Sequence, residues 1–250
     1  MRKIAALPSL LTLSNLLCGF HALYFASQRT PDGLTLAAWM IFFAMVFDAL
    51  DGKVARLARA SSQFGAELDS LADMVSFGVA PAFLVAMLSA HVGLQHQRLV
   101  WLSCMVFAVC TALRLARFNV QTDLDADSHQ SFNGLPSPAA AGQVAALVIL
   151  HEHLAARFGI TVLPRLLPTV TFFTGALMVS RIRYPHLVSR FLGGHHAFAE
   201  LAFAAIVVLL LATHKELTLA SGFSLYVVAG MAGAVRHAVF HPAEEEKPIF

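Results

Sequence analysis

The sequence carries little charge. Only 13% of its 250 residues are charged, roughly half the share of a soluble domain, whereas 58% are hydrophobic. Its 3 cysteines all fall inside apolar stretches, and their number and spacing match neither a disulfide framework nor a metal motif. The net charge is +2, and no basic cluster indicates a nucleic-acid partner. These shortages argue against a soluble domain, a disulfide scaffold and a nucleic-acid-binding protein.

Long apolar runs are abundant instead, and several reach the roughly 17–25 residues that cross a bilayer. We predict an all-α, polytopic transmembrane helical bundle that forms one domain over residues 1–250, with no internal repeat. Its start could be a secretion signal, but bulky Leu17 and the interruption at Pro8 favour a retained N-terminal interfacial helix. About eight spans are expected, near residues 14–27, 34–52, 69–90, 98–117, 136–155, 162–180, 197–213 and 217–239.

The basic residues predict the orientation of these spans. If the N-terminus is cytoplasmic, twelve of the 17 lysines and arginines lie on the inner side, which the positive-inside rule favours. The other five are Arg29, Arg98, Arg157, Arg165 and Lys215. Both termini are therefore expected inside, in the cell membrane of a prokaryote because no cleavable or organelle-targeting segment is seen.

Four aspartates stand where two predicted spans reach the cytoplasmic surface, in the segment 48–73 (DALDGKVARLARASSQFGAELDSLAD). Asp48 and Asp51 are three apart and Asp69 and Asp73 are four apart, so each pair shares one face of a helix. Ionised groups are costly at the ends of apolar spans, and four converging carboxylates repel each other unless a cation joins them. Short oxygen ligands suit Mg2+ or Mn2+. The pattern predicts a divalent-metal site.

The residues between the aspartates add to this prediction. Gly52 and Gly65 leave room for a ligand against the backbone, and Arg56 offers a permanent cation to a phosphate. Metal, arginine and a spare carboxylate together favour phosphoryl transfer. The alternative, solvated helix-end charges paired with Lys53 and Arg59, gives no reason for four acids at these offsets.

The pattern Asp48-x2-Asp51-Gly52-x2-Ala55-Arg56-x8-Gly65-x3-Asp69-x3-Asp73 resembles, position for position, the motif of the CDP-alcohol phosphotransferase family. The resemblance implies a membrane enzyme with a six-helix core, here with two added spans, that displaces CMP using Mg2+ or Mn2+. It implies Asp48, Asp51 and Asp69 as metal ligands, with Asp73 as the general base near the same metal. It places against the CDP moiety Asp48, Gly52, Ala55, Arg56, Gly65 and Asp69.

Four further segments, 8–20 (PSLLTLSNLLCGF), 75–83 (VSFGVAPAF), 113–120 (LRLARFNV) and 132–141 (FNGLPSPAAA), are similar to the membrane-bound phosphatidylserine synthases of that family. This resemblance reaches to about residue 145. It implies CDP-diacylglycerol and L-serine as substrates, phosphatidylserine and CMP as products, and a homodimer in the lipid bilayer. Serine is a zwitterion, so its pocket needs a cation and hydrogen-bond acceptors. The candidates are Ser76, Arg114, Arg117 and Asn119.

Other interpretations remain open at this point. The same arginines could be anchors that reach toward the headgroups. Arg114, Arg117 and Arg181 could also bind a phosphorylated acceptor such as glycerol 3-phosphate or inositol phosphate. A cation carrier that uses the aspartates as an ion path is a third possibility, although carriers place such groups near the midplane and often in repeats.

Overall fold

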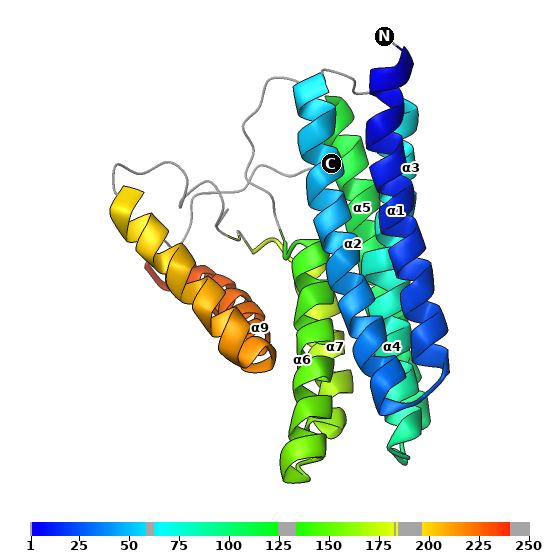
Figure 1. The fold of residues 1–250 in the computed structure, drawn as a ribbon, viewed down its shortest axis with the longest axis vertical. Coiled ribbons are helices and arrows are strands. Elements are labelled where there is room, and N and C mark those ends of the chain that lie inside the picture. The colour runs from blue at the N-terminus through cyan, green and yellow to red at the C-terminus, as the bar shows by residue number, and fades with distance from the viewer. Residues whose placement is uncertain (1, 59–62, 125–133, 183, 185–196, 241–250) are drawn as a thin grey trace.

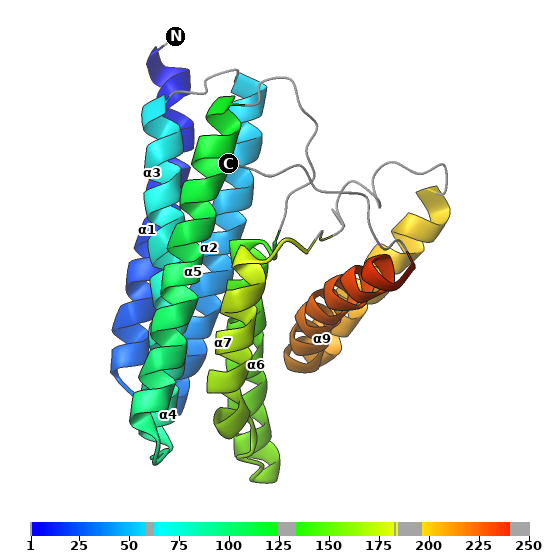
Figure 2. The ribbon, with the colours of Figure 1, turned by 180° about the vertical axis from the view of Figure 1, so that it is seen from behind.

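The computed structural model describes residues 2–58, 63–124, 134–182, 184 and 197–240, and every regular element in this part of the chain is a helix (Figures 1 and 2). The elements are α1 (Arg2–Ser27), α2 (Pro31–Ala58), α3 (Gln63–Asp73), the π-helical segment η1 (Met74–Val79), α4 (Ala80–His91), α5 (Gln97–Leu124), α6 (Ser137–Phe158), α7 (Leu163–Val179) and α9 (Ala197–Phe240). Because η1 continues α3 into α4, the three elements make one long helix.

Six described stretches are long and apolar enough to cross a membrane, and α7 is a shorter apolar helix. The stretches are Pro8–Ser27, Pro31–Ala55, Gln63–His91, Gln97–Val120, Ser137–Phe158 and Leu210–Gly233. The predicted polytopic helical bundle is confirmed, but the count of eight spans is not. The predicted spans 197–213 and 217–239 belong to α9, which bends at His214 (φ −139°, ψ 54°). The predicted interfacial helix and first span form one continuous helix, α1.

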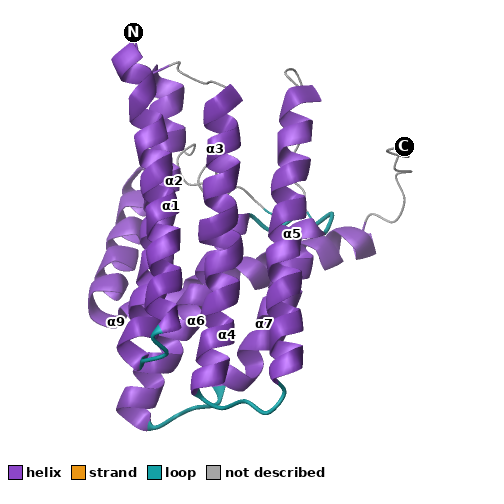
Figure 3. Ribbon diagram, turned by 90° about the vertical axis from the view of Figure 1, so that its right-hand side faces the viewer, coloured by secondary structure: helices purple, strands orange, loops and turns teal. Residues whose placement is uncertain are grey.

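The helices α1, α2, α3–α4 and α5 stand nearly parallel, as Figure 3 shows, while α6 and α7 pair beside them and α9 lies at an incline (Figure 1). The turn between α1 and α2 is specified locally. Arg29 takes a positive φ of 53°, and the Thr30 hydroxyl accepts the Gly33 N–H at 3.1 Å. Thr30 therefore caps α2, whose first residue is Pro31.

The segment before α6 is tied to the end of α7. Gly134 N–H donates to the Ile182 carbonyl at 2.8 Å, and Leu135 N–H donates to the Leu177 carbonyl at 3.0 Å. Gly134 has a φ of 96°, and a Cβ there would collide with the Met178 carbonyl, so only glycine fits. This tie fixes where α6 begins, next to the upper part of α5.

Small side chains let the central helices approach closely, as in other membrane bundles. Two aromatic rings, Phe77 of η1 and Phe107 of α5, fill the space between them and are fully buried. The buried alanines of α2 and α6 include Ala37, Ala38, Ala44, Ala140, Ala141 and Ala145. The core thus combines these small side chains with larger aliphatic ones such as Leu34, Ile41 and Leu84.

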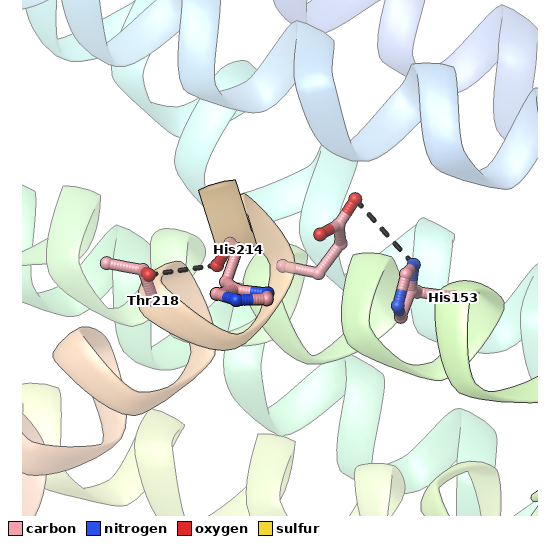
Figure 4. A network of polar contacts seen from close by, with 4 residues as sticks. His153, His214 and Thr218 are labelled. Carbon is pink, nitrogen blue, oxygen red and sulfur yellow. Dashed lines mark hydrogen bonds and ion pairs between the residues drawn. The ribbon is translucent and has the colours of Figure 1, made fainter. Parts of the chain in front are cut away.

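Helix α9 docks on α6 near its own bend. His153 Nδ1 lies 3.8 Å from a Glu216 carboxylate oxygen, and Thr218 donates its hydroxyl hydrogen to the His214 carbonyl at 2.8 Å (Figure 4). Further along α9, Gln143 of α6 donates to the Ser224 hydroxyl at 3.0 Å. The contacts of His153 with Glu216 and of Gln143 with Ser224 join α9 to α6, whereas the Thr218 hydrogen bond lies within α9 at its bend.

Replacing Gly19 with alanine should destabilise the bundle. A Cβ at Gly19 would collide with the Ser76 side chain and lie 2.9 Å from its Cα, so α1 and η1 would have to separate. We expect the free energy of unfolding in detergent to fall by about 1–3 kcal/mol. Gly222→Ala is the matched control, because its Cβ would meet nothing within 4 Å. Equal stability of the two variants would contradict this packing.

Candidate active site

Three of the four predicted aspartates converge between α2 and α3. One carboxylate oxygen from each of Asp48, Asp51 and Asp69 lies within 4.8 Å of the other two. Asp51 is buried and the other two are half-buried. Oδ1 of Asp69 is buried and has no hydrogen-bond partner. Three carboxylates this close together repel one another, and a buried oxygen without a hydrogen-bond partner is costly. The arrangement is therefore unfavourable unless a positively charged ligand binds between them.

Helix α1 supplies two hydrogen bonds to this region. Thr12 donates its hydroxyl hydrogen to Oδ2 of Asp51 at 2.9 Å, and Asn15 donates from Nδ2 to Oδ1 of Asp73 at 3.0 Å. Asp73 is buried and lies outside the three-oxygen group, within electrostatic reach of Asp48 and Asp69. The fourth aspartate is therefore held by α1 beside the cluster.

Thr12 and Asn15 are site residues that the sequence reasoning missed. A signal was present, because two polar residues three apart share one helix face inside an apolar run, and Gly19 continues that face. Both side chains are buried, Asn15 completely. Oδ1 of Asn15 has no hydrogen-bond partner, although its Nδ2 is engaged by Asp73. This face of α1 thus has one hydrogen-bond acceptor without a partner, Oδ1 of Asn15, next to the aspartates.

The π-helical segment η1 begins directly after Asp73. π-Helical turns are rare and occur frequently at functional sites, because the extra residue in the turn re-aims the side chains. Here the segment buries Ser76 completely and lets its hydroxyl donate to the Asn15 carbonyl at 3.0 Å. The predicted acceptor-pocket residue Ser76 therefore links η1 to α1.

The other predicted acceptor-pocket residues contact different parts of the bundle. Arg114 donates from Nη1 to the Ser137 hydroxyl at 2.7 Å and is within electrostatic reach of Asp73 and Asp48. Arg117 instead donates to the Val179 carbonyl at 3.5 Å, at the end of α7. Asn119 accepts a hydrogen bond from Ser70 of α3 at 3.1 Å. Of these three, Arg114 is the one that lies between the acids and the start of α6.

The predicted CDP-binding residues occupy the upper part of α2 and the start of α3. Gly52 is exposed, and a Cβ there would meet nothing within 4 Å, so the backbone beside Asp51 is open to a ligand. Ala55 and Gly65 are half-buried. The side chain of Arg56 lies outside the described residues.

The residues present fit a divalent cation. Carboxylate oxygens are the ligands that Mg2+ and Mn2+ prefer, and the unpartnered Oδ1 of Asp69 is buried among them. Asp48, Asp51 and Asp69 would hold the ion. No other group of three or more histidine, cysteine, aspartate or glutamate side chains within ligand distance occurs in the part of the chain that the structure describes.

The fold and the site together define a multi-pass helical membrane protein with an acidic cluster between α2 and α3. Residues 5–183 match the sequence model of the CDP-alcohol phosphatidyltransferases, and the chain belongs to this family. The family predicted from the aspartate motif is thereby confirmed. Its members are enzymes and generally depend on a divalent metal.

Curated relatives in several prokaryotes carry one name, CDP-diacylglycerol–serine O-phosphatidyltransferase. That of Helicobacter pylori strain ATCC 700392 / 26695 is 37% identical over 179 residues, which is 72% of this chain and 71% of the relative. That of Methanocaldococcus jannaschii is 35% identical over 185 residues, 74% and 76% of the two chains. That of Bacillus subtilis strain 168 is 34% identical over 181 residues, 72% and 90%.

Proposed function

We propose that this protein transfers the phosphatidyl group of CDP-diacylglycerol to the hydroxyl of L-serine, giving phosphatidylserine and CMP. The observation that carries the proposal is the convergence of Asp48, Asp51 and Asp69 beside buried Asp73, in a chain of this family. The choice of serine is supported by the names of the relatives.

In this proposal Asp48, Asp51 and Asp69 hold Mg2+ or Mn2+, with Asp73 close to the same ion. When bound, the ion offsets the negative charge of the pyrophosphate and of the departing CMP. The open backbone at Gly52 gives the CDP moiety room to approach. The remaining contacts to CDP are assigned to Asp48, Ala55, Arg56, Gly65 and Asp69.

Asp73 acts as the general base. It takes the proton of the serine hydroxyl, whose oxygen attacks the phosphorus that bears the diacylglycerol, and the bond from that phosphorus to the CMP oxygen breaks. The hydrogen bond from Asn15 fixes the Asp73 carboxylate at one oxygen and leaves the other for the proton. One in-line displacement suffices, and no covalent enzyme intermediate is needed.

The acceptor site is assigned to the space between Asp73, Asn15 and Arg114. Arg114 can bind the serine carboxylate, because its guanidinium offers several donors and one of them is used by Ser137. The unpartnered Oδ1 of Asn15 can accept from the serine ammonium. Ser76, Arg117 and Asn119 are engaged by neighbouring helices and would shape the walls of the pocket.

The site is placed on the cytoplasmic side of a cell membrane. Four of the five basic residues predicted outside, Arg29, Arg98, Arg157 and Arg165, lie in or beside the three connections at the lower end of the bundle (Figure 1). The aspartates lie toward the other end, in the second half of α2 and in α3. The distribution of positive charge therefore supports a cytoplasmic site. A homodimer stays a prediction.

The acceptor is tested by measuring CMP release from CDP-diacylglycerol and Mn2+ with the purified protein. Serine, glycerol 3-phosphate and inositol 1-phosphate are added in separate reactions. We expect CMP release in the reaction with serine and none in the reactions with the two phosphorylated alcohols. Release only with a phosphorylated alcohol would retain the reaction class and overturn the choice of serine, while flux of cations without any release would favour a carrier.

Replacing Asn15 with leucine should slow the reaction without unfolding the protein. The side chain keeps its size but loses its hydrogen bond to Asp73, so the base is less well oriented. Partners of this kind around a metal centre are worth about 10–100-fold. We expect that loss in kcat, together with a higher KM for serine. Ser14→Ala, on the same helix, removes only a hydroxyl that bonds the Leu10 carbonyl within α1, and it should leave both constants unchanged. Equal behaviour of the two variants would remove Asn15 from the site.

A further inference from the structure

An apolar groove lies between α2 and α9. Its volume is about 600 Å³, within the range of small-molecule sites. The lining is apolar apart from Lys53 and Lys215. The walls include Val46 and Leu50 from α2 and Leu211, Leu219 and Phe223 from α9.

Aromatic and basic side chains mark the two ends of the groove along α2. The Phe42 and Phe223 rings meet at 5.7 Å between centroids, and the Lys215 ammonium lies 5.6 Å above the Trp39 ring. These contacts join α2 to α9 at the Trp39 end of the groove, while Lys53 lines the other end, two residues after Asp51. From Trp39 to Lys53 the helix rises about 21 Å. Half of a bilayer's hydrocarbon core is about 15 Å, so the groove is long enough for one lipid tail.

The groove and the acidic site lie on neighbouring faces of α2. Successive residues of a helix turn by about 100°, so Ala49 in the groove wall is one step from Asp48 in the site. Gly52 lies between the two faces, is exposed, and presents no side chain to block passage. A ligand can therefore have its phosphates at the aspartates and its tail in the groove. Lys53 offers a cation at the mouth, where such a phosphate group enters.

We propose that this groove holds one acyl chain of the CDP-linked lipid substrate, and the proposal rests on the function proposed above. A peptide segment is a poor occupant, because backbone N–H and C=O groups need partners inside a membrane and the lining offers almost none. A hydrocarbon tail needs only contact with apolar side chains. Helix α9 lies beyond the residues 5–183 that match the family, so this wall adds tail recognition to the shared catalytic core.

The test fills the groove from the α9 side, far from the aspartates. In Leu219→Trp, the KM for CDP-dioleoylglycerol should rise about tenfold, the effect of losing roughly two buried methylene groups. The KM for CDP-dihexanoylglycerol, whose tails are too short to reach Leu219, should change less than twofold, which also shows that the variant is folded. Val46→Phe, from the α2 wall, should reproduce this pattern. Leu225→Trp, on the same helix but 70% exposed and outside the groove, should behave as the wild type.

A rise in KM that is equal for long and short tails, or no rise with either, would overturn the proposal. Binding of the two lipids without serine, followed by native mass spectrometry, separates this outcome from failure of the proposed function. If the wild type binds the long-tailed lipid more tightly and Leu219→Trp loses that preference, the acyl-chain groove is supported even when no CMP is released with serine. If serine yields CMP and tail length has no effect on binding, the groove assignment is wrong and the function stands.

Discussion

Asp73→Asn should lose serine-dependent CMP release by about 10²–10⁴-fold, the usual contribution of a positioned general base. The substitution keeps the shape of the side chain and its place beside Asn15, but an amide cannot take the proton of the serine hydroxyl. Binding of CDP-diacylglycerol and of the metal by Asp48, Asp51 and Asp69 should be retained, so the loss should fall on kcat. The measurement is initial CMP release at saturating serine and lipid.

Glu67→Gln is the matched control, because it makes the same chemical change on the same helix at an exposed position. It should retain full activity. If Asp73→Asn remained as active as this control, the assignment of the base would be wrong, and the proton would have to leave by another route such as water. A loss confined to the KM for CDP-diacylglycerol would instead make Asp73 a binding residue.

Removal of divalent cations should abolish CMP release, and Mg2+ or Mn2+ should restore it. The acidic cluster gives the reason, because three carboxylate oxygens within 4.8 Å of one another repel when no cation joins them. Asp51→Asn removes one negative ligand and should weaken the apparent metal affinity by about 100-fold or more. Titrating activity against Mn2+ for each variant measures this shift.

Thr12→Val provides the graded comparison. It leaves all three ligands in place and removes the hydroxyl that orients Asp51 and that also reaches the Pro8 carbonyl of its own helix, so the metal titration should shift by about tenfold. Metal-binding measurements on protein without substrate should follow the same order. Full activity in the presence of a strong chelator, or identical titrations for both variants and the wild type, would contradict a metal held by these aspartates.

Much of this architecture could be predicted from the sequence because the signals are local. Apolar runs of spanning length indicated the bundle, and the aspartate offsets placed Asp48 and Asp51 on one face of α2. The same offsets brought Asp69 to them from α3.

Other features depend on tertiary contacts that no local pattern encodes. In the sequence, Thr12 and Asn15 are only two polar residues inside an apolar run. They become hydrogen-bond partners of Asp51 and Asp73 because α1 packs against α2 and η1 in the folded protein. The divergence of Arg114 from Arg117, three residues later, depends on where α6 begins and where α7 ends. The predicted count of eight spans is not confirmed, because the predicted spans 197–213 and 217–239 belong to one helix that bends at His214.

The most direct test of the central claim follows the serine itself into lipid. Purified protein is given CDP-dioleoylglycerol, Mn2+ and ¹⁵N-labelled L-serine, and the extracted lipid is analysed by mass spectrometry. We predict labelled phosphatidylserine in a one-to-one ratio with released CMP, and neither product from Asp73→Asn. CMP released without labelled lipid, as in simple hydrolysis, would contradict the proposed transfer to serine.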